Sequence, residues 1–281
     1  MNNSEDFTTV KHKRGKKFKT PRLKTVTSPF RKVDDECDES ELLIKTENLK
    51  TQRKQLISSD IFKESKFFKE VCGMVKTIEY LPSASCDYDL VVFGLGNFSS
   101  SLIAKQQLDL ALALRSELNI SHGQTLCYDP VFTSVEIKTL QDLEWVVPEV
   151  NQEGKGRSEK TCIYYLPHCD KILYNNLLWA NWSKELLSKI VIIGNSFSSI
   201  VERTPKRLLE KNGNYILKIE PYMLEQALPD TYSEKDVFND TSIHTFPVER
   251  LQSLPTIYWE ENMEPIYSNE ETDFIKDSGD L

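Results

Sequence analysis

The stretch YDLVVFGLGNFSSSLIAKQQLDLALALRSEL, residues 88–118, holds the pattern that decides the fold. Residues 90–93 are apolar at every position, which is typical of a parallel strand buried on both faces. The run ends at Gly94, Gly96 and three serines, and residues 102–118 then carry apolar side chains at helical spacing. The stretch therefore predicts a strand, a tight turn and a helix, the unit from which α/β sheets are built.

The same alternation continues along the chain. Short apolar runs predict strands at 125–128, 145–147, 161–166, 189–193, 214–219 and 241–246. Helical spacing of apolar residues predicts helices over 39–80, 102–118, 139–146 and 169–182. These elements predict one α/β domain over 39–255, with a helical lead-in at 39–80, a motif core at 87–200 and a closing segment at 214–247. We expect a Rossmann-like, doubly wound and mostly parallel sheet with flanking helices.

Charge is distributed unevenly along the 281 residues, whose net charge is −8. Residues 11–32 hold ten Lys or Arg and no acidic residue, whereas 260–280 hold eight acidic residues and one Lys. Both segments are poor in core-forming residues, so we expect a disordered basic tail at 1–38 and a disordered acidic tail at 256–281. The basic tail is either a nuclear-localisation or nucleic-acid patch or a solvated extension without a partner. No nucleic-acid role is expected for the core.

Several classes of protein are excluded by composition. The longest apolar runs fall well short of 18 residues, which predicts no transmembrane helix and no membrane partner. The N-terminus lacks the apolar region of a secretory signal. The six cysteines lie at irregular spacing and form no C-x-x-C pair. We therefore expect them to be reduced thiols. We therefore expect a cytoplasmic protein, with the nucleus as a second location.

Polar segments follow four of the predicted strands. In an open α/β sheet, ligands bind at the carboxyl ends of the strands, so these segments predict a ligand-binding rim. Its candidate residues are Gly94, Gly96, Asn97, Ser99, Asp129, His168, Asn175, Asn176, Asn195 and Ser196.

The turn GLGNFSSS has two interpretations. Its glycines allow close backbone approach, and its serines allow amide groups to face an anion. The dinucleotide fingerprint is incomplete, however, because Ser99 stands where the third glycine belongs. Asp129 lies 33 positions after Gly96, whereas the fingerprint expects an acidic residue roughly 20 residues on. A structural turn is therefore favoured over a nucleotide site, and Asp129 before Pro130 favours a local Asx turn over a ribose contact.

His168 and Cys169 follow the predicted strand at 161–166. His168 is a candidate general acid or base, Cys169 a candidate thiolate, and both are candidate haem ligands. No further ligand lies at metal-site spacing, so we predict no metal site and favour a capping and packing role. The segment IGNSFSS places Ser196 in a turn that lacks the closing glycine of a nucleophile elbow. A serine hydrolase with Asp129 or Asp240 and His168 or His244 is therefore disfavoured.

Five segments in order carry a family resemblance: YDLVVFGLGNFSSSLIAKQQLDLAL, YDPVF, YYLPHCDKILYNNLLWANW, VIIGNSFSSI and FNDTSIHTFP. Together they resemble the SRR domain, named for "sensitivity to red light reduced", over 87–200 and again at 238–247. The charged tails fit a fungal member of the branch associated with benomyl resistance. The resemblance implies a regulatory role, linked to circadian-clock input in plants, haem-biosynthesis regulation in animals and microtubule-related processes in yeasts. It assigns no catalytic residues.

Two functions and a variant remain open. The first is a non-enzymatic regulator whose rim binds a small ligand or a partner protein, with a possible link to tubulin or the microtubule pathway. The alternative is a Rossmann-like transferase that uses S-adenosylmethionine or a nucleotide, held at Gly94, Gly96 and Asp129. The variant is a haem-responsive protein with His168 or Cys169 as axial ligand. We favour the non-enzymatic regulator because no complete catalytic constellation is recognisable in the sequence.

Overall fold

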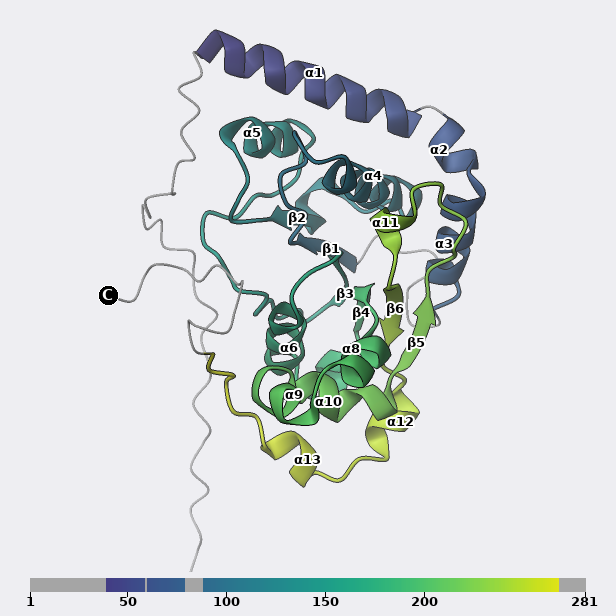
Figure 1. Cartoon of the computed structure of the whole chain (residues 1–281), viewed down its shortest axis with the longest axis vertical. Helices are drawn as coiled ribbons and strands as arrows, with labels where there is room; N and C mark the ends of the chain where they lie inside the picture. The colour runs from purple at the N-terminus through teal and green to yellow at the C-terminus, as the bar shows by residue number, and fades with distance from the viewer. Residues whose placement is uncertain (1–38, 59, 79–87, 268–281) are drawn as a thin grey trace, which may run out of the picture.

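A six-stranded sheet runs through the middle of the molecule in the computed structural model, which describes residues 39–58, 60–78 and 88–267 (Figure 1). The strand order is β2-β1-β3-β4-β6-β5. The first four strands in this order are parallel, whereas β6 is antiparallel to both β4 and β5. The strands are β1 (Tyr88–Phe93), β2 (Thr125–Tyr128), β3 (Thr161–Leu166), β4 (Ile190–Asn195), β5 (Leu224–Ala227) and β6 (Thr241–Thr245).

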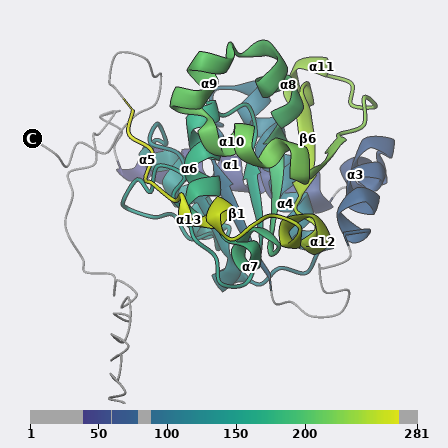
Figure 2. The same cartoon turned by 90° about the horizontal axis from the view of Figure 1, so that it is seen from below.

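Helices cover both faces of this sheet (Figures 1 and 2). On the first side, called the α4 face, lie α1 (Glu39–Ser58), α2 (Asp60–Glu64), α3 (Lys66–Lys76), α4 (Leu102–Glu117), α5 (Ser134–Asp142) and α11 (Lys235–Phe238). On the second side, called the α6 face, lie α6 (Lys171–Ala180), α7 (Lys184–Leu187), α8 (Phe197–Arg203), α9 (Lys206–Asn212), α10 (Asn214–Ile219), α12 (Val248–Gln252) and α13 (Ile257–Glu260). Two short 3₁₀ turns are η1 (His122–Gln124) and η2 (Glu220–Tyr222).

The predicted α/β class with flanking helices is confirmed. The Rossmann-like, doubly wound arrangement is not confirmed, because β6 and β5 make the sheet mixed at one edge. Residues 214–219 were predicted as a strand and instead form helix α10. Its buried residues Tyr215, Ile216 and Ile219 lie on one helical face, and a short apolar run alone does not separate the two structures.

Two further elements differ from their predictions. Strand β5 has the sequence LEQA and is largely exposed, so it carries no hydrophobic pattern that would reveal it. Around residue 146 the chain forms an isolated bridge between Leu126 and Val146 instead of a strand. The preceding helix was predicted over 139–146 and is α5, which ends at Asp142. It begins earlier than expected, at Ser134, where Thr133 and Glu136 form a capping box.

Helix α1 forms an outer layer over α4 and α5, where a buried ion pair holds it (Figure 1). Arg53 Nη1 lies 2.7 Å and 2.6 Å from the two carboxylate oxygens of Asp109 on α4. Burial raises the pKa of Asp109, and the Arg53 charge opposes that rise. The helical spacing of the lead-in is confirmed, although this ion pair between positions 56 residues apart has no sequence signature.

The chain stays ordered beyond the predicted boundary at residue 255. Tyr258 and Trp259 of α13 pack against the α6-face core, and Tyr267 is buried. The predicted tail at 1–38 and residues 268–281 of the acidic tail lie outside the described residues. Every helix within the described ranges is too short or too polar to cross a bilayer.

Candidate functional site at the carboxyl edge of the sheet

The chain reverses its direction of sheet growth between β1 and β3, since β2 lies on one side of β1 and β3 on the other. Ligands of open α/β sheets bind beyond the carboxyl ends of strands at such a point. The turn after β1 begins at Gly94, and Asp129 follows β2. His168 follows β3, and Ser196 follows β4. Because these four strands are parallel, the predicted segments do meet at one edge.

The glycine turn after β1 is filled by carboxylates of the chain itself. Gly94 and Gly96 have φ angles of 69° and 72°, a left-handed conformation that suits glycine. The Gly96 amide donates to Asp129 Oδ2 at 2.7 Å, and the Ser99 amide donates to Glu136 Oε1 at 2.7 Å. These are amides that a bound phosphate would use, so the turn is a strand-to-helix connection with its own internal anions.

Asn97 completes the turn. Its Oδ1 accepts from the Ser100 amide at 3.1 Å and from the hydroxyls of Ser99 and Ser100 at 2.8 Å each. Ser101 then caps α4 by accepting from the Ala104 amide. The polar side chains of this motif therefore stabilise the turn and the N-terminus of α4.

Asp129 forms the Asx turn that the sequence favoured. Its Oδ1 accepts from the Val131 amide at 2.9 Å, while Oδ2 holds the Gly96 amide. Burial raises the pKa of Asp129, and the two amide hydrogen bonds oppose the rise. With both oxygens bound to backbone, the carboxylate joins β1 to β2 and is poorly placed to take a ribose.

A crevice of about 210 Å³ opens on the α6 face of the edge. Its lining includes Phe93, Gly94, Tyr128, Asp129, Cys169, Asp170 and Leu173. The Cys169 thiol is buried and lies 3.4 Å from the Phe93 carbonyl oxygen. Burial raises the pKa of Cys169 well above its ordinary value, which keeps the thiol protonated and unsuited to a thiolate role.

Metal and haem chemistry gain little support from this geometry. Among the described residues, no group of three or more His, Cys, Asp or Glu is arranged to hold a metal ion. Cys169 is directed at backbone carbonyls, so of the two haem-ligand candidates only His168 has an accessible side chain.

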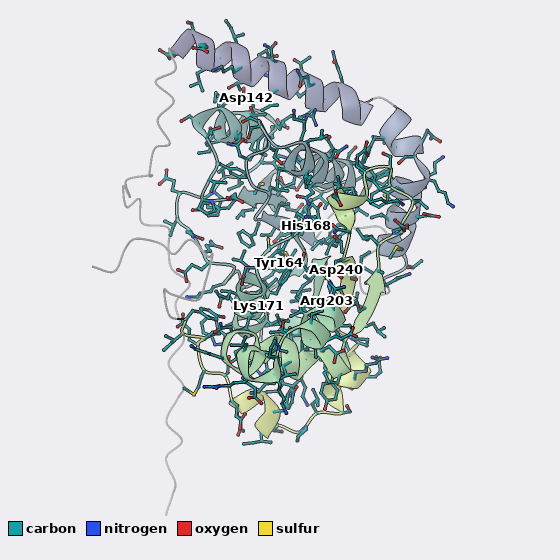
Figure 3. The ribbon with its side chains drawn as sticks, in the orientation of Figure 1. Asp142, Tyr164, His168, Lys171, Arg203 and Asp240 are labelled. Atoms are coloured by element: carbon teal, nitrogen blue, oxygen red, sulfur yellow. The ribbon has the colours of Figure 1, made fainter. Side chains whose placement is uncertain are left out.

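His168 lies on the edge between the two helical layers (Figure 3). Its φ angle is 53°, an uncommon value for a residue with a side chain. The buried Gln107 of α4 has its Nε2 3.4 Å from His168 Nδ1 and also donates to the Val237 carbonyl at 3.0 Å. The histidine is thus exposed at the surface and in contact with a buried amide beneath it.

Nine buried side-chain polar atoms lack a hydrogen-bond partner within the described part of the chain, and two of them lie near the carboxyl ends of β3 and β4. These two are the hydroxyl of Tyr165, whose residue is 0% exposed, and Oδ1 of Asn195. Tyr165 pairs with Ile193 in the β3–β4 register, so Tyr165 and Asn195 share the α4 face on neighbouring strands. The amide group of Asn195 donates to the Cys169 carbonyl at 2.9 Å, next to His168.

Unpaired buried polar groups are rare, and each costs about 1–3 kcal/mol of folding free energy. Burial, together with the Cys169 thiol and the Tyr232 phenol, raises the pKa of Tyr165 well above its ordinary value. The Tyr165 hydroxyl therefore stays protonated and can both donate and accept a hydrogen bond. We call Tyr165, Asn195, His168 and Gln107 the edge cluster.

A larger pocket of about 400 Å³ lies beyond β4. Its lining includes Ser196, Glu225, Tyr232, Phe238, Asp240 and Ser242. Tyr232 connects this pocket to the edge cluster, because its phenol is close enough to raise the pKa of Tyr165.

Ser196, His244 and Asp240 do not form a hydrolase triad. Ser196 caps α8 by accepting from the Ser199 amide at 3.0 Å, and Asp240 pairs with Arg203 at 3.1 Å (Figure 3). His244 is fully buried, with Nδ1 3.1 Å from the Ile192 carbonyl and Nε2 3.3 Å from the Phe197 amide. Burial lowers the pKa of His244 to about 4, which keeps the ring neutral.

Asn175 and Asn176 do not join the edge cluster. Both are buried in α6, where their side chains bond Tyr267, the Tyr215 amide and the Glu153 carbonyl. They were predicted to lie on the ligand-binding rim, but they instead make structural hydrogen bonds on the α6 face.

Four functional or supporting residues escaped the sequence prediction. Gln107 had a weak signal, because it is a polar residue within the apolar run of α4. Tyr165, Glu136 and Glu225 had none, since a tyrosine in a strand and a glutamate in a helix or an exposed strand are ordinary. Glu225 accepts from the Ser198 amide at 3.0 Å, so it holds the second glycine-containing turn as Glu136 holds the first.

Comparisons with known proteins agree on one family. The family model of the SRR1 domain matches residues 74–245. An SRR1-like protein of Mus musculus is 39% identical over 142 residues, which cover 50% of this chain and 57% of that protein. An SRR1-like protein of Drosophila melanogaster is 34% identical over 162 residues, covering 58% and 56%.

A plant relative is more distant. The protein SENSITIVITY TO RED LIGHT REDUCED 1 of Arabidopsis thaliana is 28% identical over 158 residues, covering 54% of this chain and 58% of that protein. The chain thus spans a little over half the length of each of these relatives. No solved structure matches it.

Proposed function

The chain belongs to the SRR1 domain family, and on that premise we propose that it is a regulatory protein that binds a small ligand at the edge cluster. The observation that carries the proposal is the pair of unpaired buried atoms, Tyr165 Oη and Asn195 Oδ1. The name of the Arabidopsis relative refers to reduced sensitivity to red light, which supports regulation in preference to metabolism. Clock input, haem-biosynthesis regulation, the microtubule and benomyl link and the cytoplasmic or nuclear location belong to the same proposal.

The chemistry of the cluster suits a ligand with neutral polar groups. Asn195 Oδ1 accepts a hydrogen bond, while the Tyr165 hydroxyl donates or accepts one. The exposed His168 offers ring nitrogens at the surface above them. A ligand that satisfied the two buried atoms would recover the free energy that they cost in the unbound protein.

The transferase alternative has less support. A nucleotide or S-adenosylmethionine held at Gly94, Gly96 and Asp129 would have to displace the hydrogen bond between the Gly96 amide and Asp129. It would also have to replace the second bond, from the Val131 amide to Asp129. Regulatory binding at the edge cluster requires neither change.

A thermal-shift screen of the full chain tests the proposal. The compounds are S-adenosylmethionine, S-adenosylhomocysteine, NAD(P), ATP, GTP and haemin. A compound at 100 times its Kd stabilises the folded state by about 2.7 kcal/mol, which is readily measured as a rise in Tm. We expect a compound that raises the Tm of the wild type to lose its effect on Tyr165→Phe.

Tyr174→Phe is the matched control, because Tyr174 is a second fully buried tyrosine near the same edge. Its hydroxyl already has protein partners, so ligand binding should survive this substitution. An equal rise in Tm for Tyr165→Phe and the wild type would overturn the edge cluster as the site. A ligand whose effect disappeared in Asp129→Asn but not in Tyr165→Phe would favour the transferase alternative.

A further inference from the structure

The two asparagines of α6, Asn175 and Asn176, form hydrogen bonds with a segment near the C-terminal end of the described chain. Residues 261–267, here called the strap, follow α13 and run beside α6 and α10 (Figure 2). None of the edge-cluster residues takes part in this contact. Asn175 and Asn176 are therefore motif residues that the proposed ligand site does not explain.

One hydroxyl joins the strap to both asparagines. The Tyr267 hydroxyl accepts from Asn175 Nδ2 at 2.8 Å and donates to Asn176 Oδ1 at 2.9 Å. The other ends of the two amides bond the fold itself: Asn175 Oδ1 accepts from the Tyr215 amide, and Asn176 Nδ2 donates to the Glu153 carbonyl. Two buried polar atoms of the domain thus depend on a hydroxyl from outside residues 74–245, the part that matches the family model.

The remainder of the strap is held by one hydrogen bond, from the Tyr215 hydroxyl to the Met263 carbonyl at 2.7 Å, and by surface contacts. Met263 is 82% exposed and Ile266 is 89% exposed, so neither apolar side chain is packed. Glu261 pairs with Lys218 at 3.2 Å and Glu264 with Lys155 at 2.9 Å. Such surface ion pairs contribute little and weaken with salt, which leaves Tyr267 as the main anchor.

A pocket of about 420 Å³ lies between the strap and the helices α9 and α10. It is lined by Glu261, Met263 and Pro265 of the strap and by Asn175, Glu210, Lys211, Asn214, Tyr215 and Lys218. Lys218, which pairs with Glu261, favours an acidic occupant, and the paired asparagines favour one that carries a hydroxyl.

We propose that the groove in which the strap lies, made of this pocket together with Asn176 and Lys155, is a docking surface for an extended, acidic, tyrosine-bearing segment of a partner protein. The strap has that chemistry and occupies the groove in cis. The partner's segment takes its place by offering its own tyrosine hydroxyl to the two asparagines. The argument stands on the charge complementarity of strap and groove, and on the need of two buried amides for a partner from outside the domain.

Peptide binding to the full chain tests this proposal. The probe is a fluorescently labelled peptide, EENMEPIYSNEET, whose sequence is that of residues 260–272. It is titrated against the wild type and against Tyr267→Ala, in which the strap has lost its anchor. We expect at least tenfold tighter binding to Tyr267→Ala, because the strap of the wild type competes with the probe.

Two controls separate docking from non-specific attraction. A peptide with Phe in place of its Tyr should bind Tyr267→Ala about tenfold more weakly, since it leaves the asparagines unpaired. Lys218→Glu added to Tyr267→Ala should also weaken binding. If Tyr267→Ala does not fold by circular dichroism, the full chain with Tyr267→Phe replaces it, because that variant loses a single hydroxyl.

Three outcomes would overturn the proposal. The first is a folded variant that does not bind the probe, which would make the strap a permanent part of the domain. The second is equal affinity for the Tyr and Phe peptides. The third is that the strap of one wild-type molecule binds the groove of a second copy. This would be seen as a concentration-dependent dimer that Tyr267→Phe abolishes.

Discussion

Two neighbouring tyrosines of one strand lie on opposite faces of the sheet and differ in whether their hydroxyls have a hydrogen-bond partner. Tyr164 and Tyr165 are consecutive in β3 and point to opposite faces. On the α6 face, the Tyr164 hydroxyl donates to the Gly156 carbonyl at 3.1 Å (Figure 3). On the α4 face, the Tyr165 hydroxyl has no partner among the described residues. The Tyr164 hydroxyl is satisfied within the fold, whereas the Tyr165 hydroxyl retains unused polar capacity at the carboxyl edge.

Other residues at the edge follow the same division. On the α6 face, Tyr174 donates to the Leu166 carbonyl and accepts from the Asn195 amide. On the α4 face, Asn195 keeps an unpaired Oδ1. A buried polar atom without a partner lowers the stability of the fold, and exceptions of this kind are expected at functional sites. The contrast between these groups at the carboxyl edge is therefore the observation that most strongly indicates where this protein binds a ligand.

Gly94→Ala should have the largest effect, because it disrupts the close packing between Gly94 and Cys169 on the α6 face. A Cβ at this position would lie 2.3 Å from Cys169 Sγ, and the φ angle is 69°. We expect a loss of about 2–4 kcal/mol of unfolding free energy, measured by urea denaturation. Adding Cys169→Ala removes the overlap and should restore part of the loss. Strictly additive losses in the double variant would contradict the close packing of the crevice.

The pH dependence of stability tests the neutral His244 on the α6 face. Its pKa is lowered from 6.5 to about 4 in the folded chain, mainly by burial. Stability is therefore complete above pH 6.5 and falls as the pH drops toward 4, because the unfolded chain binds the proton first. The loss should reach about 3 kcal/mol.

Glu225 adds to this loss at the acid end. Burial raises its pKa, but hydrogen bonds from Ser196 and Ser198 and the nearby His244 leave it lowered overall. Its stabilisation is present above its ordinary pKa and disappears as the pH falls through the lowered value. Urea unfolding from pH 7.5 to about 3 measures the sum, and His244→Gln should flatten the curve between pH 6.5 and 4.5. An unchanged slope in that variant would show that another group titrates.

Tyr174→Phe should have a moderate effect. It deprives the Leu166 carbonyl and the Asn195 amide of their shared partner. Each unpaired buried group carries a cost, so we expect a loss of about 1–3 kcal/mol by urea denaturation. A variant as stable as the wild type would mean that unpaired groups cost little at this edge, and the contrast between the hydroxyls of Tyr174 and Tyr165 would lose its meaning.

The sequence was sufficient for the parallel half of the sheet. Strands β2 and β3 have the predicted bounds, and β1 and β4 differ from them by one or two residues. Their apolar runs end at Gly, Pro or Asp, which are clear local signals. Strand β6 was also predicted, at 241–246, but not its antiparallel direction. Strand β5 was missed because it is an exposed tetrapeptide whose structure is imposed by pairing with β6.

The site was predictable only in outline. Topology brings the polar strand ends together, so His168, Asn195 and Asp129 were found as a group. Which atoms remain unpaired depends on contacts between distant segments, such as the Gly96 amide with Asp129 and Gln107 with His168. Asn175 and Asn176 were assigned to the rim because helix orientation, which turns them toward Tyr267, has no local signature.

The smallest expected change is also the most direct test of the central claim, that the edge cluster retains polar capacity for a ligand. It is the unfolding free energy of Tyr165→Phe in the absence of ligand, measured by urea denaturation beside the wild type. Because the hydroxyl has no partner, we predict that the variant is equally stable or more stable, by up to about 1 kcal/mol. A loss of more than 1 kcal/mol would show that the hydroxyl is already satisfied, and would contradict the account.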